Sequence, residues 1–350
     1  MSRRSTGRVV VVLGASSGIG RATAVTLARR GDTLVLASRS ADALADVERE
    51  CRAAAQGRSA GRSGRRSTGP TGDAARRVSV VPTDVSLRSS VEHLFRVTLE
   101  RHGRIDAVVH SPAVVAYGTF EQVPAEVYDQ VVTTNLLGAA NVARLALQTF
   151  KDAGGGHLVL VGSLLGKIAT PFMSSYVTSK WGLHGLARTL QAEVRYVRGV
   201  HVSLVTPGGV DTPIYAQAAS YARREGRPPI PVDPPEKLAR AIVRVLDHPR
   251  RETSVGLANH VWTAGFRFMP AVYDVLVAPA MSRAGLSMTP SPQDHTGNVF
   301  APVPAGEATH GKWGRHWMRG VAVGGAGVAA LAAVVAGAAL RSSTEDAGRS

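Results

Sequence analysis

Three residues whose side chains can move a proton lie near the middle of the chain. Tyr176 and Lys180 are four residues apart in Ser175-Tyr-Val-Thr-Ser-Lys-Trp, and Ser163 ends an apolar segment thirteen residues before the tyrosine. Positions four apart share a helix face, so the phenol and the ammonium can point into one cleft. A nearby cation lowers a phenol pKa from its usual value near ~10, and a serine hydroxyl can bind the oxygen that changes charge. These groups suit proton exchange with a carbonyl or alcohol oxygen.

A tyrosine and a lysine at this spacing also occur on the solvated edges of ordinary helices. The pair therefore indicates a catalytic site only if the surrounding strands and helices are those that would position both side chains in one cleft.

A glycine-rich turn near the start of the chain predicts a dinucleotide site. Residues 9–13 are apolar and mostly β-branched, which is typical of a strand buried on both faces, and Gly14, Gly18 and Gly20 follow at once. An Ala/Leu helix pattern then runs from about residue 19 to 30. Gly14 allows the tight turn, Gly18 lets a pyrophosphate approach the backbone, and the helix N-terminus attracts the anion. The spacing is Gly-x-x-x-Gly-x-Gly, and the alternative is merely a tight strand-to-helix turn.

The end of the second predicted strand, residues 33–37, indicates which dinucleotide is bound. Many NAD sites carry an acid about 20 residues after the glycines, whereas this chain has Ser38 and Arg39 there and no acid before Asp42. A guanidinium can pair with a 2′-phosphate, so NADP(H) is favoured while NAD(H) stays possible. The alternative is a solvated arginine at a helix start.

The remaining pattern alternates between strands and helices. Strand-like segments lie at residues 78–85, 105–110, 157–161 and 200–205, and helical patterns include 128–150 and 175–196. This alternation predicts an α/β fold of the Rossmann type, a doubly wound parallel sheet in a single catalytic domain over residues 1–257, followed by a C-terminal helical tail.

With these motifs in their order, the chain resembles the short-chain dehydrogenase/reductase family across roughly residues 6–257, with a C-terminal extension beyond the usual length. The matching points are Gly14, Gly18, Gly20, Asp84, Val85, Asn135, Ser163, Tyr176, Lys180, Pro207, Gly208 and Thr212. The resemblance implies that Tyr176 is the general acid or base, Lys180 binds the nicotinamide ribose and lowers the tyrosine pKa, Ser163 holds the substrate oxygen, and Asn135 sustains a water-linked proton relay.

The resemblance also implies a set of cofactor contacts, in which Asp84 and Val85 meet the adenine and the segment after Pro207 follows the nicotinamide. The full set is Gly14, Ser16, Ser17, Gly18, Ile19, Gly20, Ser38, Arg39, Asp84, Val85, Ser111, Lys180, Pro207, Gly208, Val210 and Thr212.

One segment departs from the family pattern. Where the family usually reads Asn-Asn-Ala-Gly, this chain reads His110-Ser-Pro-Ala. Small Ser111 and Ala113 still allow a close backbone approach, but Pro112 has no N–H. His110 is interpreted as a hydrogen-bonded structural residue, with an extra acid/base as the alternative, and Trp181 as a packing residue.

The net charge and the cysteine content limit which further binding sites and which cellular compartment the sequence predicts. The formal net charge is +15, and residues 52–77 contribute seven arginines against Asp73. This Gly/Ser/Arg-rich stretch predicts a disordered surface insert, with nonspecific binding to nucleic acid or anionic lipid as the alternative. The lone Cys51 excludes an internal disulfide and suits a reducing compartment. No His/Cys cluster has metal spacing, so no metal site is expected.

The C-terminal part predicts an extension and a membrane anchor. Residues 258–311 form an extension and linker, with one or two helices in 259–286 that pack on the domain or face a bilayer, followed by a Pro-punctuated linker over 287–304. Residues 321–340 carry no charge and predict a transmembrane helix, with a soluble Ala-rich or dimerising helix as rivals. Flanking positive charge then predicts a cytoplasmic catalytic domain tethered to the membrane.

The sequence thus predicts an NADP(H)-dependent oxidoreductase that interconverts a ketone or aldehyde and an alcohol, acting on a small molecule and forming a homo-oligomer. Its rivals are a catalytically silent nucleotide-binding regulatory or scaffold protein, a sugar-nucleotide epimerase or dehydratase, and a basic nucleic-acid-binding module. Residues 213–233, expected to form a lid-like loop, would decide the substrate.

Overall fold

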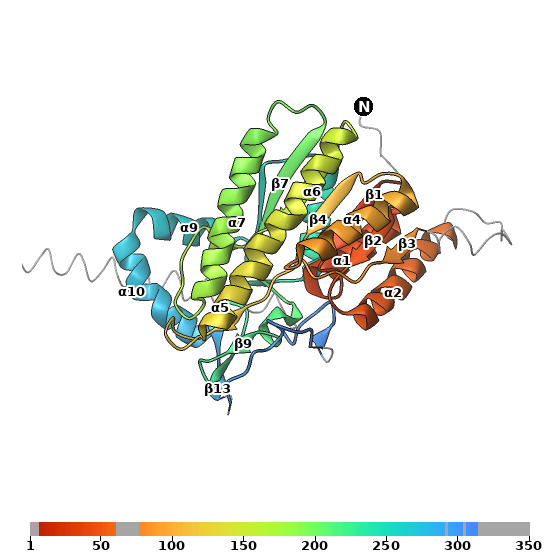
Figure 1. The fold of residues 1–350 in the computed structure, drawn as a ribbon. Helices are drawn as coiled ribbons and strands as arrows, with labels where there is room; N and C mark the ends of the chain where they lie inside the picture. The colour runs from red at the N-terminus through yellow and green to blue at the C-terminus, as the bar shows by residue number, and fades with distance from the viewer. Residues whose placement is uncertain (1–6, 61–76, 291–292, 304–305, 314–350) are drawn as a thin grey trace, which may run out of the picture.

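A seven-stranded sheet, parallel throughout, forms the centre of the structure (Figure 1). This computed structural model describes residues 7–60, 77–290, 293–303 and 306–313. The strand order is β12-β7-β6-β4-β1-β2-β3. The strands are β1 (Val9–Leu13), β2 (Thr33–Ala37), β3 (Val78–Val80), β4 (Ala107–His110), β6 (Gly156–Val161), β7 (Val200–Pro207) and β12 (Glu252–Val255).

Helices cover both faces of this sheet. One face carries α1 (Gly18–Arg30), α2 (Ala41–Ala60) and α8 (Pro235–Asp247), and the other carries α4 (Arg88–His102), α6 (Gly138–Asp152) and α7 (Ser174–Glu193). The side chains of β1 alternate between the two cores, with Val11 and Leu13 in one and Val10 and Val12 in the other. A strand packed on both sides has to be apolar at every position, which explains its unbroken run of apolar residues. The predicted doubly wound fold is confirmed.

The sheet has its topological switch point between β1 and β4. The chain passes from β1 to β2 on one side, and from β4 to β6 on the other. In open α/β sheets the crevice outside the carboxyl ends of two such strands is where ligands bind. The glycine turn follows β1 and the segment His110-Ser-Pro-Ala spans the end of β4, so both lie at this crevice.

Shorter elements build a cap beside the carboxyl edge. Three two-stranded pairs join β5 (Ala116–Tyr117) to β9 (Ala219–Ser220), β8 (Gly209–Val210) to β11 (Val232–Asp233), and β10 (Arg224–Gly226) to β13 (Leu286–Pro290). The helical pieces are α5 (Ala125–Val132), η1 (Thr133–Leu137), η2 (Leu164–Gly166), η3 (Pro213–Tyr215), α9 (Ala258–Phe268), α10 (Pro270–Ala280) and η4 (Met281–Gly285). The predicted lid-like region thus contains short strands that pair with segments far away in sequence.

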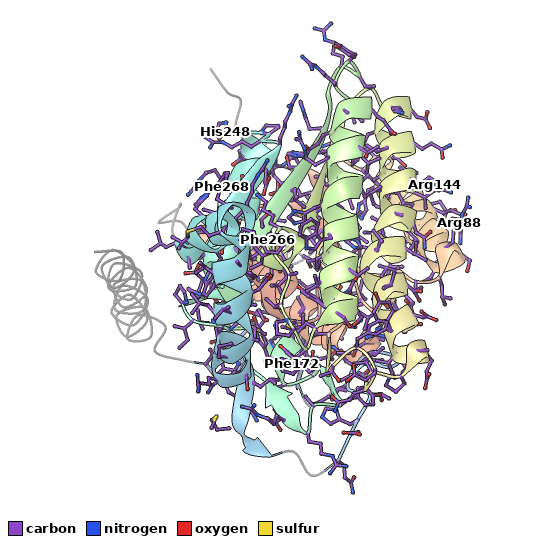
Figure 2. All side chains as sticks on the ribbon, turned by 90° about the vertical axis from the view of Figure 1, so that its left-hand side faces the viewer. Arg88, Arg144, Phe172, His248, Phe266 and Phe268 are labelled. Carbon is purple, nitrogen blue, oxygen red and sulfur yellow. The ribbon has the colours of Figure 1, made fainter. Side chains whose placement is uncertain are left out.

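The extension after β12 packs on the catalytic domain through aromatic residues. Phe266 of α9 lies 5.1 Å from the ring of Tyr273 and 6.0 Å from that of Trp181 on α7, measured between centroids. The Tyr273 hydroxyl donates to the carbonyl oxygen of Ala169 at 2.7 Å. Figure 2 places Phe266 and Phe268 on the same helix, and the Phe268 side chain is mostly exposed. Packing on the domain therefore uses one side of α9, and the packing role expected for Trp181 agrees with its contact.

Two expectations about the less regular parts of the chain were wrong. Residues 52–60 continue α2 rather than starting a disordered insert, because the alanines there favour helix and Arg52 pairs with Glu48 one turn earlier at 2.7 Å. Residues 287–290 belong to β13, and 293–303 lie against the crevice rather than forming a free linker. Residues 61–76 and the predicted transmembrane segment 321–340 lie outside the described residues. Within the described part of the chain, no helix is both long enough and apolar enough to cross a membrane.

Candidate active site

The glycine turn forms the floor of a crevice at the switch point. Gly14 and Gly18 have φ angles of +75° and +52°, a region that favours glycine. A Cβ on Gly20 would lie 2.0 Å from the carbonyl oxygen of Gly14. The turn is therefore built so that backbone, without side chains, faces the crevice.

Most of the predicted cofactor residues line this crevice together. Those that do are Gly14, Ser16, Ser17, Gly18, Ile19, Gly20, Ser38, Arg39, Asp84, Val85, Ser111 and Thr212. The unusual Pro112 and Ala113 line it as well. The Ser111 hydroxyl donates to the Leu13 carbonyl at 2.7 Å, and the Pro112 nitrogen would lie 2.8 Å from a Cβ on Gly14. The departure from the family pattern thus packs closely on the glycine turn and keeps the wall in place.

A second cavity of about 290 Å³ adjoins the first and holds the proton-transfer residues. Ser163, Tyr176 and Lys180 line it, together with the predicted cofactor residues Pro207, Gly208 and Val210. The two cavities share Ile19, Ser111, Ala113, Thr212 and Ile214. A molecule lying in the crevice can therefore meet a second one bound beside Tyr176.

The Tyr176 phenol is neutral at neutral pH in this environment. Burial raises its pKa to about 12, and its hydrogen bond with the Ser163 hydroxyl opposes that rise. The Lys180 ammonium lies 5.5 Å from the tyrosine ring centroid and donates to the Val161 carbonyl at 3.2 Å. Burial also lowers the pKa of Lys180 to about 8. The expected lowering of the tyrosine pKa is therefore wrong for this structure, because the loss of water around both groups outweighs their proximity.

A protonated phenol beside a serine hydroxyl is arranged to give a proton to an oxygen, which is the step that carbonyl reduction needs. The reverse direction requires the phenolate, which burial disfavours.

Asn135 lies behind the site rather than in it. It is fully buried in η1, its Oδ1 accepts from the Val114 N–H at 2.8 Å, and its Nδ2 donates to the Val114 carbonyl at 2.9 Å and to the Ser179 hydroxyl at 3.1 Å. It belongs to neither cavity lining. Asn135 fastens the segment after β4 to the α7 turn that carries Tyr176 and Lys180, and its relay role stays a prediction.

His110 is buried without the hydrogen bonds that were expected of it. It is 1% exposed, and neither ring nitrogen has a hydrogen-bond partner among the described residues. Burial, with the Lys180 charge, lowers its pKa to about 3, so the ring is neutral. The hydrogen-bonded part of the structural interpretation was wrong, because both ring nitrogens are buried and neither has a partner among the described residues.

The sequence did not identify the far wall of the second cavity. Trp262, Tyr273, Val277 and Met281 come from the C-terminal helices and, with the buried Tyr117, line it beside Tyr215. Burial raises the pKa of Tyr117 and of Tyr215, and both side chains lie within electrostatic reach of Tyr176. The C-terminal extension thus supplies an apolar wall to the site. Only its aromatic content hinted at this role.

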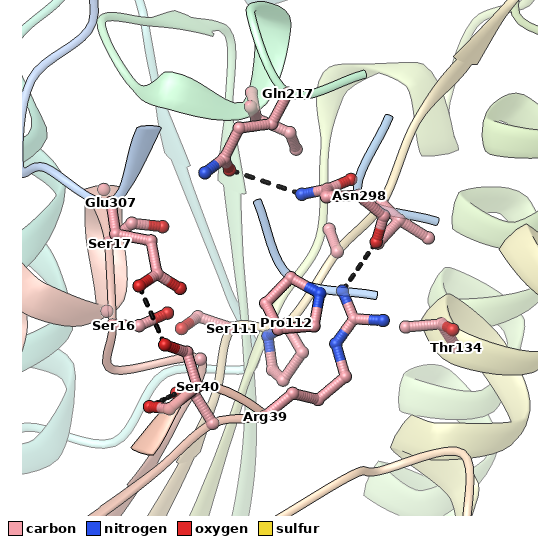
Figure 3. A pocket seen from close by; sticks show the side chains of 18 of the residues that line it. Ser16, Ser17, Arg39, Ser40, Ser111, Pro112, Thr134, Gln217, Asn298 and Glu307 are labelled. Carbon is pink, nitrogen blue, oxygen red and sulfur yellow. Dashed lines mark hydrogen bonds between the residues drawn. The ribbon is translucent and has the colours of Figure 1, made fainter. Parts of the chain in front are cut away.

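The sequence also missed the strap, which we define as residues 293–303 and 306–313. Asn298, Pro302, Val303 and Glu307 of the strap line the cofactor crevice, as does Gln217 (Figure 3). The Gly18 N–H donates to the Ala308 carbonyl at 2.9 Å. No local sequence pattern predicts these contacts, because they join residues that are far apart in sequence.

Comparisons with known proteins agree with this geometry. Residues 8–64 and 65–222 match the short chain dehydrogenase family. The chain is similar to the uncharacterized oxidoreductase YxnA of Bacillus subtilis (strain 168), with 29% identity over 318 residues, 89% of this chain and 82% of that protein.

Two solved structures share the fold. An alcohol dehydrogenase from the archaeon Thermococcus sibiricus, complexed with 5-hydroxy-NADP, is 27% identical with a TM-score of 0.58 and covers 71% of this chain and 95% of its own. A metagenomic short-chain oxidoreductase in complex with NADP is 26% identical with a TM-score of 0.57 and covers 72% and 98%. The chain thus belongs to the short-chain dehydrogenase family, as an oxidoreductase that acts on CH–OH groups with NAD(P).

Proposed function

We propose that this protein is an NADP(H)-dependent reductase or dehydrogenase that interconverts an apolar ketone or aldehyde and its alcohol. The observation that carries the proposal is that Ser163, Tyr176 and Lys180 line one cavity, which adjoins the glycine crevice.

The crevice fits a nicotinamide dinucleotide. Its glycine turn leaves room that a Cβ would fill, and the Gly18 amide at the N-terminus of α1 already holds an acceptor oxygen, that of Ala308. A pyrophosphate oxygen needs the same donor. When bound, the dinucleotide supplies or accepts the hydride.

The chain itself manages the proton and the substrate oxygen. In reduction, the Ser163 hydroxyl holds the carbonyl oxygen while the Tyr176 phenol gives it a proton, and the Lys180 ammonium lies near enough to favour the phenolate that remains. In oxidation the same phenolate accepts the alcohol proton. Asn135 positions this turn of α7 through Ser179.

The cavity wall favours an apolar substrate. Apart from the catalytic groups, its lining is dominated by side chains such as Leu164, Val115, Met173, Trp262 and Met281. Apolar surface gains free energy when it leaves water, at about 25 cal/mol per Å². A lipophilic ketone or secondary alcohol uses this wall better than a sugar does.

Arg39 supports NADP(H) as the cofactor. It lines the crevice directly after β2, where the ribose substituent is recognised, and two similar structures were solved with NADP or a derivative of it. A guanidinium there recognises a 2′-phosphate.

The proposal is tested by removing the hydroxyl of Tyr176. Tyr176→Phe should lower turnover about 10²- to 10⁴-fold, the usual contribution of a general acid, while the NADPH dissociation constant changes little. NADPH absorbance with a panel of steroid, retinoid and fatty-acyl ketones measures turnover, and Tyr196→Phe, at a side chain that is 88% exposed, is the matched control. Full activity of Tyr176→Phe refutes the assigned role.

Two further proposals rest on sequence. Residues 321–340 are proposed to tether a cytoplasmic catalytic domain to the membrane, and the chain is proposed to form a homo-oligomer. Membrane fractionation of the full chain, compared with a chain ending at Trp313, tests the first. Light scattering tests the second. Recovery of the full chain only in the soluble fraction refutes the tether.

A further inference from the structure

The strap places a carboxylate beside Ser40, which directly follows Arg39, the residue proposed to recognise the ribose end of the cofactor. The Ser40 hydroxyl donates to Oε2 of Glu307 at 2.9 Å (Figure 3), and Arg21 donates to the Glu307 carbonyl at 3.2 Å. Arg21 and Arg39 both lie close enough to the carboxyl to act on its charge. The Glu307 side chain is partly buried in the wall of the crevice.

The strap also engages Arg39, the residue expected to bind a 2′-phosphate. Its guanidinium donates to the Asn298 carbonyl at 2.6 Å and to the Val299 carbonyl at 3.2 Å. Both polar side chains that follow Ser38 at the end of β2, Arg39 and Ser40, therefore already have acceptors from the strap.

The strap is anchored on both sides of Glu307. Asn298 donates from its backbone N–H to the Gln217 carbonyl at 2.8 Å and from Nδ2 to Gln217 Oε1 at 3.3 Å. On the other side, the Trp313 N–H donates to Asp211 Oδ1 at 3.1 Å. The bond between Gly18 and Ala308 has to yield to any pyrophosphate, but these anchors do not involve the crevice floor. They hold the strap on the domain at two points away from the glycine turn.

We propose that Glu307 is a specificity-determining residue that weakens the preference for NADP(H) over NAD(H). A 2′-phosphate bound by Arg39 would compete with the carboxylate for the Ser40 hydroxyl and would face its negative charge. A ribose 2′-hydroxyl can instead donate a hydrogen bond to it, as it does to the acid of many NAD sites. The role rests on the proposed function, because it concerns the same cofactor site.

The experiment measures binding without turnover. Isothermal titration of the full chain with NADPH and with NADH compares wild type, Glu307→Gln, Glu307→Lys and the control Asp294→Asn, which removes an exposed carboxylate from the same strap. Glu307→Gln should bind NADPH about tenfold more tightly, the value of one charge-assisted contact. Glu307→Lys should bind it more tightly still. NADH affinity should stay level or fall, and Asp294→Asn should change neither.

The outcomes separate the role of Glu307 from the proposed function. Equal changes for the two dinucleotides, or weaker NADPH binding in Glu307→Gln and Glu307→Lys, overturn the role of Glu307 and leave the proposed function standing. Absence of binding of either dinucleotide to wild type and variants sinks the proposed function itself. Thermal melting of each variant confirms that it is folded.

Discussion

Replacing Lys180 with methionine should make the folded protein more stable while abolishing its chemistry. The ammonium is 2% exposed, and the hydrogen bond described for it goes to the Val161 carbonyl. The aromatic ring of Tyr176, whose phenol is neutral, lies 5.5 Å from the ammonium, measured to the ring centroid. Burial therefore removes most of its hydration, the described residues supply no carboxylate in return, and the lowered pKa reflects that cost.

The size of the effect follows from that pKa. It falls from 10.5 to about 8, and each pKa unit corresponds to about 1.36 kcal/mol, so the charged lysine costs the fold about 3 kcal/mol at neutral pH. Methionine forfeits the bond to Val161, worth about 1 kcal/mol. Lys180→Met should thus raise the free energy of unfolding by about 2 kcal/mol.

The sign of the pH dependence makes this prediction specific. Below pH 8 the lysine is charged in both the folded and the unfolded state, and its cost is fully present. Between pH 8 and 10.5 the folded state releases the proton and the unfolded state keeps it, so wild-type stability rises with pH. The gap between variant and wild type should accordingly narrow over this range.

Urea unfolding of both proteins from pH 6 to pH 10, without added dinucleotide, measures the gap. Lys180→Arg serves as the control, because it keeps a buried cation and should gain no stability. A Lys180→Met protein that is less stable than wild type at pH 7, or a gap that is constant with pH, would show that the ammonium is compensated and that the reasoning fails.

Two other predictions concern the glycine turn and the buried histidine. Gly20→Ala should lose dinucleotide binding, measured by titration, and should melt at a lower temperature, because its Cβ would lie 2.0 Å from the Gly14 carbonyl oxygen. The control is Gly185→Ala on α7, where open space surrounds the added methyl group. Its free energy of unfolding should rise by up to about 1 kcal/mol. His110→Leu should raise the free energy of unfolding by about 1–3 kcal/mol in urea, because it removes a buried ring without hydrogen-bond partners among the described residues. The folded ring stays neutral down to about pH 3, whereas the unfolded ring binds a proton from about pH 6.5. The wild-type protein therefore loses stability through His110 as the pH falls from 6.5 to 3. His110→Leu should lose less stability than wild type over the same range. A His110→Leu protein that loses stability in acid as steeply as wild type contradicts this.

Local sequence was enough to predict the sheet, the glycine turn and the catalytic turn of α7. The run at 9–13 has to be apolar because both of its faces are buried, and Tyr176 and Lys180 share a helix face because of their spacing. Residues that line the crevice directly after a strand, such as Ser38 and Arg39 after β2, were found in the same way. In each case the signal and the structure lie within one or two adjacent elements.

Burial could not be predicted in this way, and it reversed one expectation. The spacing of Tyr176 and Lys180 suggested an acidic phenol, whereas the pKa depends on how much water the surrounding elements remove. Those elements include the C-terminal helices, whose Trp262 and Tyr273 line the same cavity. Their contribution requires the tertiary fold, so the sequence pattern could supply the pair but not its protonation state.

The cofactor preference is a second property that local sequence could not predict. A search for the ribose-binding acid examines the residues that follow β2, and there it finds Arg39 and Ser40. The folded chain brings its carboxylate to that place from Glu307, which lies beyond the catalytic domain in sequence and bonds Ser40 at 2.9 Å. If both proposals hold, an arginine positioned by β2 and a glutamate positioned by the strap would act on the same ribose position with opposite preferences. On this proposal the balance between NADP(H) and NAD(H) depends on the strap, and altering the strap should change the balance without changing any residue of the glycine turn.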